Sequence, residues 1–125
     1  MARTLKRATG DLGESIAEKF LINKGFMIIE RNYSKKWGEV DIIAERAGLV
    51  RFVEVKAQTV HGSREMSDYS PEELAHDSKL KKVARTASLY MEEKKDDREY
   101  QVDVVAVVLD TENKLARCRF YEQVL

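Results

Sequence analysis

Two short segments place two carboxylates and a lysine inside apolar sequence. They are Gly38-Glu39-Val40-Asp41 and Glu54-Val55-Lys56, and both are flanked by β-branched residues. An ionised side chain in such surroundings costs free energy unless something binds it. Two carboxylates and an ammonium group that converge on one sheet face are typical of a magnesium site that hydrolyses phosphodiesters.

A single β-hairpin can bring these groups together. We expect strands at 39–45 and 50–57, joined by a turn at Arg46-Ala47-Gly48-Leu49 in which Gly48 can adopt a positive φ. A turn centred between Ala47 and Gly48 places Asp41 opposite Glu54, with Cβ atoms about 5 Å apart. A loop with an odd number of residues shifts the register by one and separates the acids, so both registers stay open.

Glu14 is a third acid that can reach this hairpin. The sequence predicts a helix that begins at a cap on Thr9 or Asp11, runs to about Asn23 and ends at Gly25. Glu14 lies at the edge of the apolar stripe of this helix and can extend over the sheet. The alternative is a first-turn glutamate that is stabilised only by the helix dipole.

The remaining elements complete an α/β pattern. Further strands are expected at 26–33, 100–109 and 116–121, and 58–70 is expected to be a loop. The capping-box sequence Ser70-Pro71-Glu72-Glu73 predicts a helix to about Lys95, with a break near Asp77-Ser78. The order αβββαββ indicates one domain over residues 1–125, with a mixed sheet flanked by helices.

Composition narrows the class of protein. The chain has 125 residues, 43% of them hydrophobic and 35% charged, and has no apolar run of the ~20 residues that span a membrane. The N-terminus carries basic residues without a following hydrophobic segment, so no signal peptide is expected. The lone Cys118 cannot form an internal disulfide, and a cytoplasmic location is expected.

The formal net charge is zero, which argues against a protein that coats nucleic acid through bulk charge. A net charge of zero is still compatible with a basic patch on one face of the protein. The densest basic cluster consists of Lys79, Lys81, Lys82 and Arg85. These residues either contact phosphates or form ordinary solvated surface.

Several motifs occur in a defined order along nearly the whole chain. They are Gly13-Glu14-x-x-Ala17, Gly25-Phe26, Arg31-Asn32-Tyr33, the two segments that contain Asp41 and Glu54, and segments 79–82 and 102–107. This ordered set resembles the YraN-like family of bacterial proteins. That family is similar to the archaeal Holliday junction resolvases and to the PD-(D/E)XK, or restriction-endonuclease-like, nucleases. The resemblance implies a restriction-endonuclease-like fold and a metal-dependent endonuclease.

The resemblance also implies roles for individual residues. Asp41, Glu54 and the backbone carbonyl of Val55 would bind Mg²⁺, with Mn²⁺ as a substitute, and Glu14 would complete the site directly or through water. Lys56 would position the attacking water or stabilise charge on the phosphate. Apart from the resemblance, the density of basic residues at Lys79, Lys82 and Arg85 in a chain without net charge predicts nucleic-acid contacts there, and a further contact is expected at Gln58. Gln58 stands where relatives often carry a basic residue, which weakens that contact.

Three functions follow from these patterns. The first is a Mg²⁺-dependent endonuclease or resolvase that acts on structured or branched DNA. The second is a catalytically silent nucleic-acid-binding module of the same fold, and the third is an adaptor that binds neither Mg²⁺ nor DNA. For the motif itself, the alternative is a cross-strand salt bridge worth under about 1 kcal/mol. A homodimer is compatible with the sequence.

Overall fold

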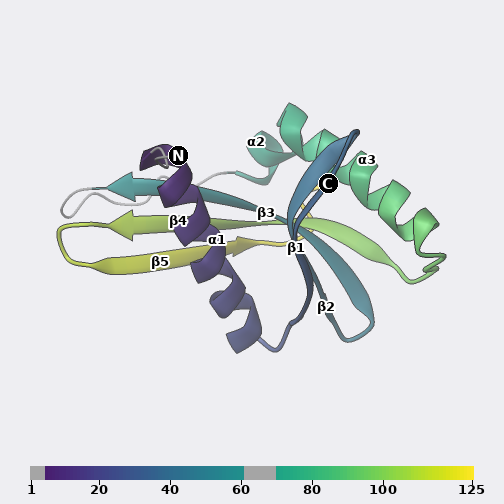
Figure 1. Ribbon diagram of the computed structural model, residues 1–125, viewed down its shortest axis with the longest axis horizontal. Coiled ribbons are helices and arrows are strands. Elements are labelled where there is room, and N and C mark those ends of the chain that lie inside the picture. Colours follow the sequence, from purple (N-terminus) through teal and green to yellow (C-terminus); the bar gives the residue numbers. More distant parts are fainter. Residues whose placement is uncertain (1–4, 61–69) are drawn as a thin grey trace.

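The computed structural model describes residues 5–60 and 70–125 as one α/β assembly (Figure 1). Its elements are α1 (Leu5–Asn23), β1 (Met27–Lys35), β2 (Gly38–Arg46), β3 (Leu49–Val60), α2 (Pro71–Ala75), α3 (Ser78–Glu93), β4 (Tyr100–Asp110) and β5 (Leu115–Tyr121). The predicted order is confirmed, and the expected second helix is divided into α2 and α3 at the predicted break.

The strands form one mixed sheet in the order β1-β2-β3-β4-β5. Strands β3 and β4 are parallel, and the other neighbouring pairs are antiparallel. A parallel pair needs a long crossover, which α2 and α3 provide. The mixed sheet flanked by helices that the sequence predicts is therefore confirmed.

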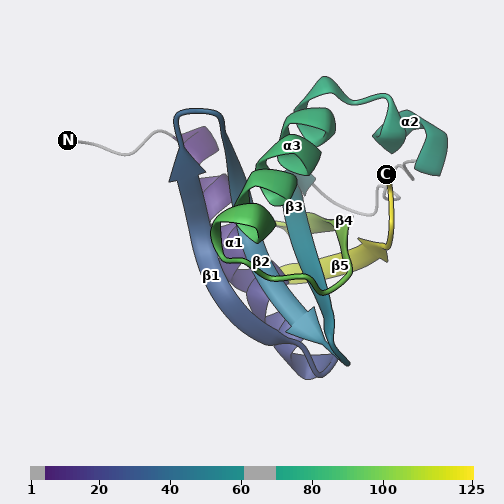
Figure 2. The same ribbon diagram turned by 90° about the vertical axis from the view of Figure 1, so that its right-hand side faces the viewer.

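Helices α1 and α3 lie on opposite sides of the sheet (Figure 2). On the α3 face, Val83 and Ala87 pack with Phe52 in one buried cluster. On the α1 face, Ala17 and Leu21 pack in a second cluster with residues of β2, β3 and β4. The sheet is thus covered by one helix on each side, and β3 contributes alternate residues to both cores.

The β2–β3 turn fixes the register of the hairpin. Arg46 pairs with Leu49 across a turn of two residues, Ala47 with φ 52° and Gly48 with φ 79°. Positive φ at both central residues is the requirement of a type I′ turn. Of the two registers left open by the sequence, the one that aligns Asp41 with Glu54 is therefore confirmed.

Several boundaries differ from the predicted ones. Helix α1 begins at Leu5, so Thr9 and Asp11 lie inside it and do not cap it. Residues 5–8 are good helix formers, which allows the helix to extend in the N-terminal direction. Strand β3 continues to Val60, into the expected loop, because β4 pairs with it as far as Asp110. The rest of that loop, residues 61–69, lies outside the described residues.

The predicted capping box of the second helix and the predicted glycine stop of the first helix are confirmed. The Ser70 hydroxyl accepts a hydrogen bond from the backbone N–H of Glu73 at 3.1 Å, and the Glu73 carboxylate accepts one from the Ser70 N–H. Gly25 has φ 91° just after α1. Over the part of the chain that the structure describes, no helix is both long and apolar enough to cross a membrane.

Candidate functional site

Asp41 lies where β2 and β3 stop pairing. Regular pairing of the two strands runs from Arg46 opposite Leu49 to Ile42 opposite Val53. At the next position, the Asp41 carboxylate accepts a hydrogen bond from the backbone N–H of Val55 at 2.8 Å. The side chain therefore replaces a strand–strand bond, and this contact holds the Asp41 carboxylate beside β3.

Glu54 is an acid inside the core on the α3 face. Its side chain is only 2% exposed, and its Oε1 lies 2.6 Å from the Nζ of Lys79 at the start of α3. The side chain of Lys79 is 63% exposed, so its ammonium reaches in from the surface. A buried carboxylate is retained only when it is neutralised or hydrogen-bonded, and Lys79 does both.

Glu14 joins the other two acids from the α1 face. The pKa of Glu14 is raised to about 7, first by burial and then by the charge of Asp41 and a hydrogen bond shared with Asp41. The pKa of Glu54 is also raised to about 7, first by burial and then by the charge of Asp41, while Lys79 opposes the shift. The three carboxylates therefore meet, with Asp41 between the other two.

A glycine allows α1 to approach β3 at this level. A Cβ atom built on Gly13 would lie 2.5 Å from the Cβ of Ala57, closer than real side chains pack. The absence of a side chain at Gly13 therefore brings the next residue, Glu14, down to the sheet. Because α1 begins at Leu5, Glu14 lies beyond its first turn, and the hydrogen bond with Asp41 confirms that Glu14 reaches inward.

The donor set fits a hard divalent cation in its chemistry. Within residues 5–60 and 70–125, no three His, Cys, Asp or Glu side chains are gathered tightly enough to form a ready-made metal centre. One oxygen of Asp41 is occupied by Val55 N–H and one oxygen of Glu54 by Lys79. The shared hydrogen bonds nevertheless place oxygens of all three acids within reach of one another. Carboxylate oxygens with an excess of negative charge are the ligands that Mg²⁺ and Mn²⁺ prefer.

Lys56 shares the face of Glu54 as predicted, but its ammonium contacts a different acid. Its Nζ lies 2.6 Å from Oδ2 of Asp77. Asp77 is the N-cap of α3 and accepts a hydrogen bond from the backbone N–H of Lys79 at 2.8 Å. The hydrogen bond from Lys56 lowers the pKa of Asp77. Lys56 and Lys79 therefore link β3 to the first turn of α3 side by side.

Of the residues predicted to bind nucleic acid, the structure places only one in contact with an acid of the site. Lys79 lies against Glu54, whereas Lys82 and Arg85 are exposed on α3 and Gln58 is half-buried on β3. The contact between Lys79 and Glu54 was missed in the sequence. Its only signal is the position of Lys79 two residues after the capping Asp77, which places it in the first turn of a helix.

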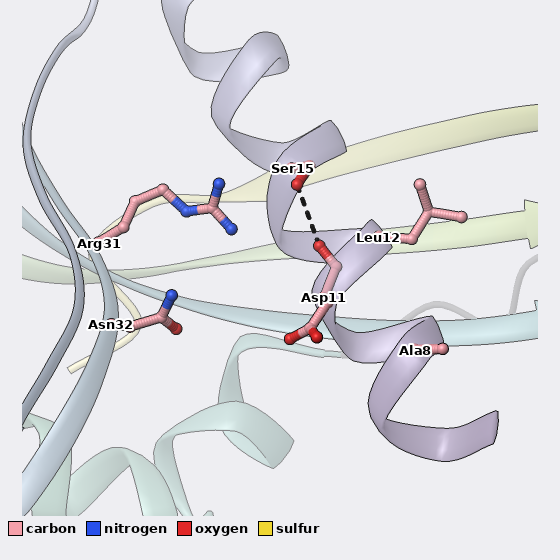
Figure 3. A pocket seen from close by; sticks show the side chains of 6 residues that line it. All are labelled: Ala8, Asp11, Leu12, Ser15, Arg31 and Asn32. Carbon is pink, nitrogen blue, oxygen red and sulfur yellow. Dashed lines mark hydrogen bonds between the residues drawn. The ribbon is translucent and has the colours of Figure 1, made fainter. Parts of the chain in front are cut away.

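Arg31 is a second residue near the site for which the sequence motifs did not indicate a role. It donates a hydrogen bond to the Glu18 carboxylate at 2.9 Å, and its charge acts to lower the pKa of Glu14. It also lines an open cavity of about 640 Å³ between α1 and β1 (Figure 3). The other lining residues are Ala8, Asp11, Leu12, Ser15 and Asn32. Its signal in the sequence is the motif Arg31-Asn32-Tyr33.

Comparison with known proteins identifies the family. Residues 13–107 match the family described as "Uncharacterised protein family UPF0102". The chain belongs to this family. The expected YraN-like membership is thereby confirmed, and the matched segment of the UPF0102 chain contains all three acids together with Lys56 and Lys79.

Relatives of this chain occur in several organisms. A UPF0102 protein of Sulfurovum sp. (strain NBC37-1) is 38% identical over 84% of this chain and 88% of the relative. Those of Clostridium tetani (strain Massachusetts / E88) and Dictyoglomus thermophilum (strain ATCC 35947 / DSM 3960 / H-6-12) are 36% and 35% identical. They cover 83% and 85% of this chain, and 82% and 86% of the relatives.

Proposed function

We propose that this UPF0102 protein is a Mg²⁺-dependent nuclease that hydrolyses phosphodiester bonds in structured or branched DNA. The observation that carries the proposal is the meeting of Glu14, Asp41 and Glu54 from three different elements. A salt bridge on an exposed sheet face does not account for this arrangement, because Glu54 is buried and repelled by Asp41.

The architecture supports assignment to the restriction-endonuclease-like proteins. Asp41 and Glu54 lie at equivalent levels of adjacent strands, and Lys56 follows two residues later on the same face. This pattern, on a mixed sheet with one helix on each side, resembles the PD-(D/E)XK nucleases and the archaeal Holliday junction resolvases.

The residues of the site would divide the chemistry among them. Asp41, Glu54, the Val55 carbonyl and Glu14 would hold the ion. The bound ion would supply a coordinated water of lowered pKa and would withdraw charge from a phosphoryl oxygen. Lys56, close to the N-terminus of α3, stabilises negative charge on the reacting phosphate.

A second candidate is a catalytically silent module that binds nucleic acid through the same fold. One observation favours it: Lys79 is already paired with Glu54, and Lys56 is already paired with Asp77. Both basic groups of the site therefore have acidic partners within the chain. In this alternative the acids and lysines stabilise the junction of α3 with β3 and do no chemistry.

A cleavage and binding assay separates these functions. The wild type, an Asp41→Asn variant and the exposed-site control Asp97→Asn are purified in parallel and incubated with single-stranded, duplex, flap and four-way DNA. Asparagine keeps a side-chain oxygen that can accept from Val55 N–H but removes the charge, so the fold is retained. Mn²⁺ binding by isothermal titration accompanies the assay.

We expect cleavage of at least one substrate with Mg²⁺ or Mn²⁺ and none with EDTA. Asp41→Asn should cleave at least about 10²-fold more slowly and lose Mn²⁺ binding, and Asp97→Asn should match the wild type. DNA binding without cleavage would contradict the nuclease function and favour the silent binding module. Absence of both DNA and Mn²⁺ binding would favour the adaptor.

A further inference from the structure

The sheet face that carries Glu54 extends beyond the acids to the edge strand β5. On β5, Cys118 and Phe120 pack against the core on the α1 face. Because side chains alternate along a strand, Arg117 and Arg119 lie on the opposite face, which is the face of Glu54. Both arginines are exposed.

The strand register aligns these arginines with Lys56. On β4, Ala106 is opposite both Lys56 of β3 and Arg119 of β5. The next row across the same three strands consists of Gln58, Val108 and Arg117. Adjacent rows on one face lie about 7 Å apart, and adjacent strands about 5 Å apart. Lys56, Arg119 and Arg117 therefore form a basic track that starts one row from Glu54.

The middle of the track consists of two small side chains of β4. Ala106 and Val108 are small side chains and both are buried, so the long basic side chains stand on either side of them. The ends of β3 and β4 and the beginning of β5 project past α3 (Figure 1). Near the track, hydrogen bonds from Asn113 lower the pKa of Asp110, and the charge of Arg117 adds to the shift in the same direction.

Charged residues on an edge strand have a simpler explanation. They protect the open edge of a sheet against pairing with another chain. Charges of either sign, on either face of the strand, would serve that protective role equally well. It does not explain why two arginines of β5 share the face of the acids and the register of Lys56.

We propose that a nucleic-acid backbone crosses this face from the three acids over β4 to β5, with Arg119 and Arg117 bound to successive phosphates beyond the one at Lys56. Arginine suits this task because its planar fork binds phosphate oxygens bidentately. The proposal rests on the proposed nuclease function. It adds β5, which lies outside the family-matched residues 13–107, to the substrate surface.

The test compares two variants that remove the same amount of charge. Arg117→Gln with Arg119→Gln removes the track, and Lys19→Gln with Lys95→Gln removes two exposed charges elsewhere. Affinity for a labelled duplex and a labelled four-way junction is measured by fluorescence anisotropy in EDTA, from 50 to 200 mM salt, with thermal unfolding as the control for folding. The pair Arg117→Lys and Arg119→Lys keeps the charge and tests rescue.

We expect the track variant to lose about 10-fold or more in affinity at low salt, and its salt slope to fall by about 2, because each lost phosphate contact contributes about 0.9. The control variant should retain the wild-type slope, and the lysine pair should restore most of it. An arginine variant with the slope of the control would overturn the track.

Failure of the track and failure of the nuclease give different results. If the wild type cleaves DNA and the arginine variant binds DNA as well as the wild type does, the track is rejected and the nuclease function is supported. If the wild type cleaves nothing, but the arginine variant loses salt-dependent DNA binding, the track is supported and the nuclease function is rejected. A wild type that binds no DNA removes both.

Discussion

The carboxylate of Asp41 joins the backbone of β3 to the two other acids. It accepts from Val55 N–H at 2.8 Å, and its charge raises the pKa of Glu14 and of Glu54. The three acids therefore gather at the position where β2 and β3 stop pairing. The lysines pair with acids on either side of this point, Lys79 with Glu54 and Lys56 with Asp77.

Replacing Lys56 tests whether it acts on the phosphate or only on the helix cap. Lys56→Met keeps the apolar stem and removes the charge, and we expect single-turnover cleavage to fall by about 10²-fold while the fold and Mn²⁺ binding survive. Asp77→Asn breaks the same ion pair but keeps a good N-cap for α3, and it should cleave close to the wild-type rate. If both variants lose the same amount of cleavage rate, Lys56 serves only as a structural partner of Asp77.

At the scale of the elements, glycines set how closely each helix approaches the sheet. Gly13 lets α1 lie against Ala57 on β3, and Gly38 lets β2 lie against Thr86 on α3. These contacts are on opposite faces of the sheet. A side chain at either glycine would push one helix outward and, with it, a residue of the site.

Gly13→Ala should therefore destabilise the protein despite the higher helix propensity of alanine. The added Cβ would lie 2.5 Å from the Cβ of Ala57. We expect overpacking to cost about 1–3 kcal/mol, which exceeds the roughly 1 kcal/mol gained in propensity. Urea unfolding measures the difference.

The second variant of this test is Ala57→Gly. In the background of Gly13→Ala it removes the opposing methyl group, and it should restore part of the lost stability and the position of Glu14. A single Gly13→Ala variant as stable as the wild type would show that α1 can move away from β3 without cost.

At the scale of the whole molecule, the acids impose a pH dependence on stability. The ordinary pKa of glutamate is 4.5, and in the folded protein those of Glu14 and Glu54 are raised to about 7. The folded state therefore holds more protons than the unfolded state between these values. By linkage, the contribution of these groups to stability is complete below about pH 4.5 and is lost as the pH rises through about 7.

Urea unfolding in EDTA at pH 5, 6, 7 and 8 tests this prediction. The free energy of unfolding of Glu14→Gln, relative to the wild type, should rise with pH across this range, because the variant lacks one of the titrating acids. Glu92→Gln, an exposed change on α3, is the matched control and should show no such trend. A Glu14→Gln variant that follows the pH profile of the wild type would contradict the raised pKa of Glu14.

Local signals in the sequence were sufficient for much of this arrangement. Gly48 indicated the position of the turn, whereas the length of the turn, and with it the register of Asp41 and Glu54, was decided by the structure. Ser70 and Glu73 are three residues apart and define the start of α2 without tertiary information. The contact of Lys79 with Glu54 had no comparable local signal, because it depends on how α3 docks on β3 and on the reach of a flexible side chain. The approach of Glu14 to Asp41 likewise depends on the docking of α1.

The parallel pairing of β3 with β4 has a consequence for how the chain assembles. Every recorded pair, from Val50 with Tyr100 to Val60 with Asp110, joins residues fifty positions apart. The antiparallel β1-β2-β3 meander closes over much shorter distances and forms earlier, since local contacts cost less loop entropy. During synthesis, the apolar edge of β3 therefore leaves the ribosome well before its partner. Until residues 100–110 arrive, that edge is the surface of the nascent chain most open to pairing with a wrong strand.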